Sequence, residues 1–261
     1  MKTALITGAS SGIGFELAKL FAKDGWKLVL VAREKNTLQK AARELEKNYG
    51  AKNTLVIACD LSEAKTPRKI FGTLKRSKIS LDALVNNAGF ATYGKFTETD
   101  LQKQLQMLQV NINSLVEMTG LFLPQMLERK SGRILNLAST AAFQPGPLMA
   151  AYYASKSFVL SFSEALSEEL EGSGVSVTAL CPGPTWTNFQ KRAGMLNSKI
   201  LAGNLMSAEK VAQIGYKGFL RGERVIVPGF ANMLGTKIVK VIPRTMLTKL
   251  IRKIQEERKP K

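Results

Sequence analysis

Short apolar runs alternate with amphipathic segments along most of this chain. Each run holds five to seven residues, is rich in β-branched side chains, and is bounded by Gly, Pro, Asn or Asp. The runs are continuously apolar, as is typical of parallel strands that are buried on both faces. Seven strands are therefore expected, at residues 3–7, 27–32, 54–59, 82–87, 133–139, 176–181 and 224–229.

The segments between these runs carry apolar residues at helical spacing. Helices are expected at residues 13–23, 35–48, 66–76, 100–129, 151–171 and 207–220. Repeated alternation of strand and helix predicts an α/β fold, namely a single doubly wound Rossmann domain over residues 1–229 with a seven-stranded parallel sheet. With 261 residues, of which 45% are hydrophobic, the chain is long enough to bury one such core.

The first strand leads directly into the glycine-rich sequence TGASSGIG at residues 7–14. Gly8 would allow a sharp turn, Gly12 would let the backbone approach a pyrophosphate, and Gly14 would permit close packing of helix on strand. The phosphates would then face free N–H groups at a helix N-terminus. Glycines also occur in tight turns that bind nothing, but a position between strand and amphipathic helix favours a dinucleotide site.

The end of the second strand indicates which dinucleotide is bound. Chains that bind NAD usually carry an acidic residue there, which accepts hydrogen bonds from the ribose 2′-hydroxyl. Here Ala32 takes that position and Arg33 follows it. A guanidinium would pair with the 2′-phosphate of NADP(H), and the hydroxyls of Ser10 and Ser11 would add donors. The alternative is that Arg33 is one solvated charge among the 38 lysines and arginines.

The chain contains no histidine, so acid–base chemistry near neutral pH needs another proton donor. The sequence YYASK at residues 152–156 supplies candidates. A tyrosine has a usual pKa near 10, and a lysine ammonium one helical turn away would lower it. Lys156 lies four residues after Tyr152 and three after Tyr153, so spacing alone does not distinguish the two tyrosines.

Further motifs occur in order between residues 3 and 229. They are TGASSGIG (7–14), CDL (59–61), NNAG (86–89), VNINS around Asn111, NLAST around Ser139, YYASK (152–156) and PGPTWT (182–187). In this whole set the chain resembles the short-chain dehydrogenases/reductases. The Tyr-x-x-x-Lys signature of that family falls on Tyr152 and Lys156, which leaves Tyr153 at a variable position that packs or lines the site.

The resemblance implies four catalytic roles. Tyr152 would act as general acid in reduction and as general base in oxidation. Lys156 would lower the pKa of Tyr152 and bind the nicotinamide ribose. Ser139 would donate a hydrogen bond to the substrate oxygen, and Asn111 would position a water in a proton relay that runs through Lys156.

The resemblance also implies cofactor contacts: Asp60 at the adenine, Asn87 at the adenosine ribose, and Thr187 at the nicotinamide carboxamide. Thr185 departs from the family pattern, which often has a β-branched aliphatic residue there. The expected cofactor-binding residues are Gly8, Ser10, Ser11, Gly12, Ile13, Gly14, Arg33, Asp60, Leu61, Asn87, Tyr152, Lys156 and Thr187. No metal site is expected, because the two cysteines, Cys59 and Cys181, are isolated and are interpreted as free thiols.

These features predict an NADP(H)-dependent oxidoreductase that interconverts a carbonyl and an alcohol, with reduction favoured. Residues 183–206, the lid segment, are rich in apolar side chains, which indicates either a hydrophobic substrate or packing on the domain itself. One alternative is a catalytically silent nucleotide-binding regulator or scaffold, against which the intact catalytic set argues. A second is nucleic-acid binding through the net charge of +18, but no nucleic-acid-binding motif occurs.

Residues 230–261 form a basic tail, with nine lysines and arginines against two glutamates. Its apolar residues predict two amphipathic helices that are separated at Pro243. The first stripe comprises Phe230, Met233, Leu234, Ile238, Val241 and Ile242, and the second Met246, Leu247, Leu250, Ile251 and Ile254. Such helices would lie at an anionic membrane surface, or pack on the Rossmann core or a second subunit.

The apolar run at residues 3–7 is too short for a signal-peptide core, and no run approaches the length of a membrane span. A cytoplasmic location is therefore expected, with membrane association through the tail as an addition. The family resemblance implies at least a homodimer, formed through residues 100–129 and 151–171. Relatives that form tetramers use a surface that the tail would cover here, so a dimer is favoured over a tetramer.

Overall fold

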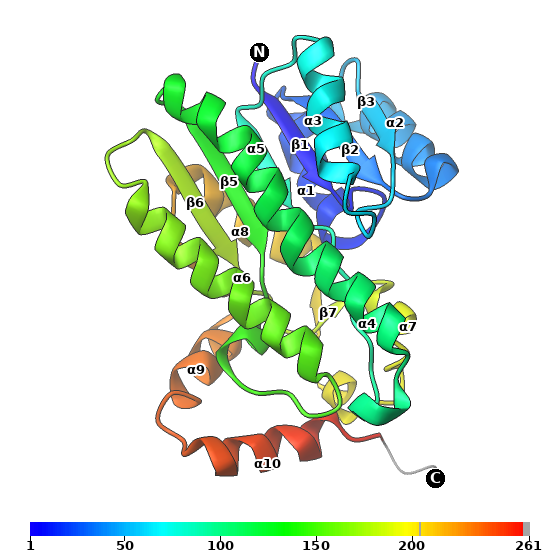
Figure 1. Ribbon diagram of the computed structural model, residues 1–261, viewed down its shortest axis with the longest axis vertical. Coiled ribbons are helices and arrows are strands. Elements are labelled where there is room, and N and C mark those ends of the chain that lie inside the picture. The colour runs from blue at the N-terminus through cyan, green and yellow to red at the C-terminus, as the bar shows by residue number, and fades with distance from the viewer. Residues whose placement is uncertain (204, 258–261) are drawn as a thin grey trace.

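The computed structural model describes residues 1–203 and 205–257, so residue 204 of the lid segment and residues 258–261 of the tail lie outside the described residues. Seven parallel strands form one sheet in the order β3-β2-β1-β4-β5-β6-β9 (Figure 1). Their bounds are β1 Thr3–Thr7, β2 Lys27–Ala32, β3 Leu55–Ala58, β4 Ala83–Asn86, β5 Gly132–Leu137, β6 Val175–Leu180 and β9 Val225–Ile226. The predicted Rossmann domain is confirmed, and its last strand is shorter than expected.

The strand order reverses at β1, which pairs with β2 on one side and with β4 on the other. Leu5 lies opposite Val29 of β2 and opposite Leu84 of β4. Connections leave these strands toward opposite sides, so a crevice forms outside their carboxyl ends. The crevice is where the expected site residues gather.

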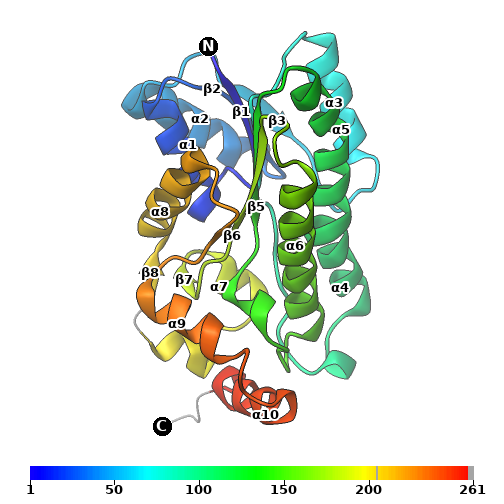
Figure 2. The same ribbon diagram turned by 90° about the vertical axis from the view of Figure 1, so that its left-hand side faces the viewer.

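Helices cover both faces of the sheet (Figure 2). One layer consists of α1 (Gly12–Lys23), α2 (Lys35–Tyr49) and α8 (Ala208–Arg221), and the other of α3 (Thr66–Arg76), α5 (Ser114–Glu128) and α6 (Ala150–Glu169). In the first layer the ring of Phe21 packs edge-on against Trp26, Tyr216 and Phe219. These two apolar layers hold the sheet rigid and fix the crevice at its edge.

The helix expected at residues 100–129 is interrupted. It consists of α4 (Leu101–Leu108), a π-helical segment η2 (Gln109–Asn113) and α5. Asp100 caps α4 by accepting hydrogen bonds from the backbone N–H groups of Gln102 and Lys103. The π-helical turn contains Asn111, and such turns often occur at functional sites.

The remaining elements lie at or near the carboxyl end of the sheet. They are η1 (Phe96–Glu98), η3 (Thr140–Phe143), β7 (Thr185–Trp186), α7 (Phe189–Ala193), η4 (Lys199–Ala202), β8 (Met206–Ser207), α9 (Phe230–Ile238) and α10 (Arg244–Gln255). The two tail helices are separated at Pro243, as predicted. Figure 1 shows α9 and α10 at the opposite end of the molecule from the N-terminus.

Candidate active site

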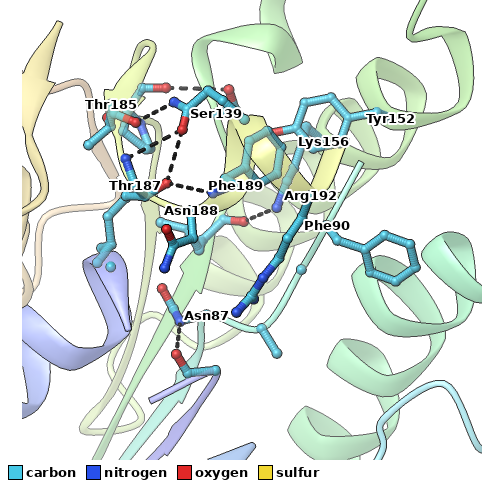
Figure 3. Close-up of a pocket in the computed structure, with 18 of the residues that line it drawn as sticks. Asn87, Phe90, Ser139, Tyr152, Lys156, Thr185, Thr187, Asn188, Phe189 and Arg192 are labelled. Atoms are coloured by element: carbon cyan, nitrogen blue, oxygen red, sulfur yellow. Dashed lines mark hydrogen bonds between the residues drawn. The ribbon is translucent and has the colours of Figure 1, made fainter. Parts of the chain in front are cut away.

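A cavity of about 300 Å³ opens at the carboxyl end of the sheet (Figure 3). It brings together most of the residues that the sequence marks as functional. Those that line it are Gly8, Ser10, Ser11, Gly12, Ile13, Arg33, Asp60, Leu61, Asn87, Ser139, Tyr152, Lys156 and Thr187. Gly14 and Asn111 are not among the lining residues.

The glycine loop at the end of β1 suits a pyrophosphate. Gly8 and Gly12 have φ values of +67° and +59°, which side chains rarely tolerate. A Cβ on Gly12 would lie 3.2 Å from Cγ2 of Thr187, so glycine keeps this part of the cavity open. The Ser11 side chain makes no capping hydrogen bond to α1 within the described residues, which leaves the first N–H groups of the helix available to an anion.

Asn87 ties this loop to β4. Its Nδ2 donates to the backbone oxygens of Thr7 (2.8 Å) and Gly8 (3.3 Å). A Cβ on Gly14 would clash with the same amide nitrogen. Gly14 therefore acts through packing, as its expected role implies, and the contact of Asn87 with a ribose stays a prediction.

Arg33 lies at the cavity wall after β2, as its expected contact with a 2′-phosphate requires. Its Nη1 is 3.9 Å from Oδ2 of Asp60, and the two side chains are 58% and 34% exposed. A pair at this separation and exposure is weak. The backbone N–H of Ser62 donates to the other oxygen of Asp60 at 2.8 Å. The guanidinium is therefore not committed to Asp60.

Tyr152 and Lys156 come from one face of α6, and Ser139 comes from the segment that follows β5 (Figure 3). Nζ of Lys156 donates to the backbone oxygen of Leu137 at 2.6 Å and lies 5.8 Å from the centre of the Tyr152 ring. Ser139 Oγ accepts from the backbone N–H of Ala141 at 3.1 Å. The three side chains that are expected to be catalytic thus share one wall of the cavity.

Burial determines the protonation of this group. It raises the pKa of Tyr152 above its usual value, although a hydrogen bond with Ser139 acts in the opposite direction. Burial also lowers the pKa of Lys156 to about 8. The sequence predicts that the ammonium lowers the pKa of the tyrosine, but in the structure loss of hydration is the larger effect and raises it. At neutral pH Tyr152 therefore retains its proton.

Asn111 lies behind the wall, next to Lys156. Its Oδ1 accepts from the backbone N–H of Phe90 at 3.2 Å, and its Nδ2 donates to Phe90 O and Ser155 Oγ, both at 3.1 Å. A Cβ on Gly89 would lie 3.0 Å from Asn111 Oδ1 and 3.6 Å from Lys156 Nζ. The π-helical turn thus fixes the amide beside the ammonium, and its role in a proton relay stays a prediction.

Comparison with known proteins agrees with this geometry. A family model described as short chain dehydrogenase matches residues 2–198. The chain belongs to the short-chain dehydrogenase family.

Three relatives of this short-chain dehydrogenase are informative. It is 38% identical over 187 residues to an uncharacterized oxidoreductase, YvrD, of Bacillus subtilis, covering 71% of this chain and 69% of that protein. It is also 38% identical to a very-long-chain 3-oxoacyl-CoA reductase of Anas platyrhynchos, covering 72% of this chain but only 61% of the duck protein. A short-chain dehydrogenase from Sphingobium yanoikuyae, solved with NADPH, superposes with a TM-score of 0.82 at 30% identity, covering 94% and 97% of the two chains.

Gln255 of this short-chain dehydrogenase was not among the predicted site residues, yet it comes from the tail and lines the same cavity. Its Nε2 donates a hydrogen bond to the hydroxyl of Tyr153. Only 1% of Gln255 and 5% of Tyr153 is exposed. A signal was present, because Gln255 is a polar residue four positions after Ile251 and eight after Leu247, on the apolar stripe of α10. Together with these residues, α10 extends the site beyond residue 229.

Proposed function

We propose that this protein is an NADP(H)-dependent oxidoreductase that reduces a hydrophobic ketone or aldehyde to an alcohol. The observation that carries the proposal is the convergence of Ser139, Tyr152 and Lys156 on one cavity that also contains the glycine loop. A nucleotide-binding regulator has no need of a protonated phenol beside a buried ammonium. The reverse reaction uses the same groups.

NADPH supplies a hydride when it is bound. The Ser139 hydroxyl holds the carbonyl oxygen and stabilises the negative charge that develops on it. Tyr152 carries its proton at neutral pH, since its usual pKa is near 10 and burial raises it further, and it gives that proton to the oxygen. Lys156 is kept in place by Leu137 O and orients the nicotinamide ribose, while Asn111 holds a water that returns a proton through Lys156.

Two features support NADP(H) as the cofactor. Arg33 lines the cavity after β2, and Ala32 stands where NAD-binding chains usually carry an acidic residue, so a guanidinium is available to a 2′-phosphate. The Sphingobium relative was solved in complex with NADPH. The first N–H groups of α1 would hold the pyrophosphate of either dinucleotide.

The apolar lining supports a hydrophobic substrate. Beyond the catalytic residues, the cavity is lined by Met149, Tyr153, Met195, Ile200 and Leu201. Three of these five belong to the lid segment. The duck relative is named as a reductase of very-long-chain 3-oxoacyl-CoA, which is also a carbonyl compound with an apolar chain.

NADPH oxidation with a panel of lipophilic ketones and aldehydes tests this function. We expect turnover with NADPH, little with NADH, and higher kcat/KM for apolar than for sugar-like carbonyls. Tight NADPH binding without turnover on any member of the panel would instead support the regulator or scaffold.

A second candidate function, membrane association through the tail, is favoured by the exposure of its apolar side chains. Val241, Met246 and Leu250 are 82%, 63% and 46% exposed. Several apolar residues of α9 are exposed as well. Six cations accompany them, namely Lys237, Lys240, Arg244, Lys249, Arg252 and Lys253. Within the described residues, no helix has the length and hydropathy to cross a bilayer. We propose a cytoplasmic protein whose tail contacts an anionic membrane surface from one side.

We also propose a homodimer. Leu101 and Leu105 of α4 are 59% and 50% exposed one helical turn apart, and Phe158 of α6 is 41% exposed. These residues belong to the two helical regions that the family resemblance implies for the dimer interface.

A further inference from the structure

Hydrogen bonds join the last turn of α10 to the lid segment and to the segment around Tyr93. The backbone oxygen of Gln255 accepts hydrogen bonds from the hydroxyls of Tyr93 (2.5 Å) and Ser198 (3.0 Å). The next backbone oxygen, that of Glu256, accepts from the N–H of Lys199 at 2.9 Å. Three segments far apart in sequence therefore meet at one point of the tail.

Apolar packing holds the inner face of the same helix. Leu247 and Ile251 are 2% and 6% exposed and belong to one buried cluster with Met149, Tyr153 and Met195. The last three residues also line the cavity. The inner face of α10 is thus continuous with the apolar part of the substrate site.

The side chain of Gln255 completes this wall. Its amide nitrogen donates to Tyr153, whose ring lies 6.1 Å from that of the catalytic Tyr152. Its Oε1 is buried and has no hydrogen-bond partner within the described residues.

We propose that Gln255 is a specificity-determining residue that closes the substrate pocket beside Tyr153 and limits the size of the apolar group that enters it. The proposal rests on the proposed function, because it concerns the substrate of that reaction. The limit is steric, since the amide occupies space that a longer chain would need. The tail is then part of the substrate site, although the sequence places it outside the catalytic domain.

Shortening this side chain tests the proposal. Gln255→Ala should shift the ratio of kcat/KM for long over short 2-alkanones upward by about tenfold, within the range that one or two methylene groups contribute to discrimination. The change should lie mainly in KM. Affinity for NADPH should stay at the wild-type value, and Thr245→Ala, an exposed position on the same helix, should leave the ratio unchanged.

A binding measurement separates this idea from the proposed function. Calorimetric titration of the NADP⁺-loaded protein with 2-alkanones from 2-butanone to 2-dodecanone, which cannot react with the oxidised cofactor, should show the same shift toward longer chains in Gln255→Ala. If the wild type reduces no carbonyl but the alkanone preference still shifts, the proposed function fails and the role of Gln255 stands. If NADPH binds normally and neither kinetic nor binding preference moves, the role of Gln255 is overturned.

A milder variant keeps the test open if the alanine variant does not fold. Gln255→Asn retains the amide and is shorter by one methylene group. It should shift the chain-length preference in the same direction and by a smaller factor. An unchanged preference in a folded Gln255→Asn that binds NADPH counts against the proposal in the same way.

Discussion

Burial acts on Tyr152 and Lys156, two of the titratable side chains of α6, in opposite directions. It raises the pKa of Tyr152 and lowers that of Lys156, since both shifts favour the uncharged form. The residue types and their spacing were readable from the sequence, and the family resemblance was needed to choose Tyr152 over Tyr153. The sequence did not show that burial has the largest effect on these two pKa values, because that effect depends on what packs around α6.

Lys156→Met should abolish activity and yet stabilise the fold at neutral pH. The shift in pKa from 10.5 to about 8 corresponds to a cost of roughly 3 kcal/mol for the buried charge, against which stands the hydrogen bond to Leu137, worth about 1–2 kcal/mol. Urea denaturation at pH 7 should therefore show a gain of about 1–2 kcal/mol in the free energy of unfolding.

The pH dependence of that gain has a definite sign. Between pH 8 and 10.5 the native lysine loses its proton while the unfolded lysine keeps it, so the stability of the wild type rises with pH. The advantage of Lys156→Met should therefore shrink across this interval. An advantage that is constant with pH would show that Lys156 carries no perturbed charge.

Tyr152→Phe should lose turnover by at least about a hundredfold, because it removes the proton donor, while NADPH still binds. Tyr153→Phe is the matched control, because it removes the hydroxyl that faces Gln255 and leaves Tyr152 in place. It should keep most of its activity in NADPH oxidation assays. The opposite outcome for the two variants would reassign the acid to Tyr153.

Arg33→Ala should weaken NADPH binding by about tenfold or more and leave NADH nearly unchanged, since hydrogen bonds to a charged group contribute about 1.5–3 kcal/mol. Fluorescence titration with both cofactors measures this difference. Lys40→Ala, an exposed position on α2, serves as the control. Equal losses for the two cofactors in Arg33→Ala would mean that it does not read the 2′-phosphate.

At the scale of elements, the strands and helices whose apolar residues follow a clear pattern were predicted within a few residues of their observed bounds. The π-helical segment was missed because its apolar residues continue the pattern of α4 and α5, and no spacing marks a change in hydrogen bonding. The tail helices were predicted, but not which side of each faces the protein. That depends on contacts such as Gln255 with Tyr153, which are 102 residues apart.

The outer face of α10 yields a prediction for this element. Leu250→Glu should abolish flotation with anionic vesicles, because it places a negative charge, which the vesicle surface repels, among the exposed apolar groups. Binding of the wild type should weaken at high salt. Leu220→Glu on α8 changes an equally apolar, 37% exposed position away from the tail and should float as the wild type does. Equal flotation of both variants would rule out a membrane contact through α10. Deleting the tail is a poorer test, since it would also remove Gln255.

For the molecule as a whole, light scattering should give the mass of a dimer. Replacing both Leu105 and Phe158 with Glu should reduce it to that of a monomer, because two exposed apolar positions in the proposed interface would become charged. Leu220→Glu again provides the control. If the wild type is a tetramer, the tail does not cover the surface through which tetrameric relatives assemble.

The contact between the tail and α6 also has a consequence during synthesis. Every strand of the sheet and the whole glycine loop leave the ribosome before α10 does. A nascent chain at that stage has the elements for holding a nucleotide, but the cluster around Met149 and Met195 still lacks Leu247 and Ile251. Newly made protein therefore exposes the apolar residues of this cluster just before release, when a chaperone or a neighbouring nascent chain can reach them.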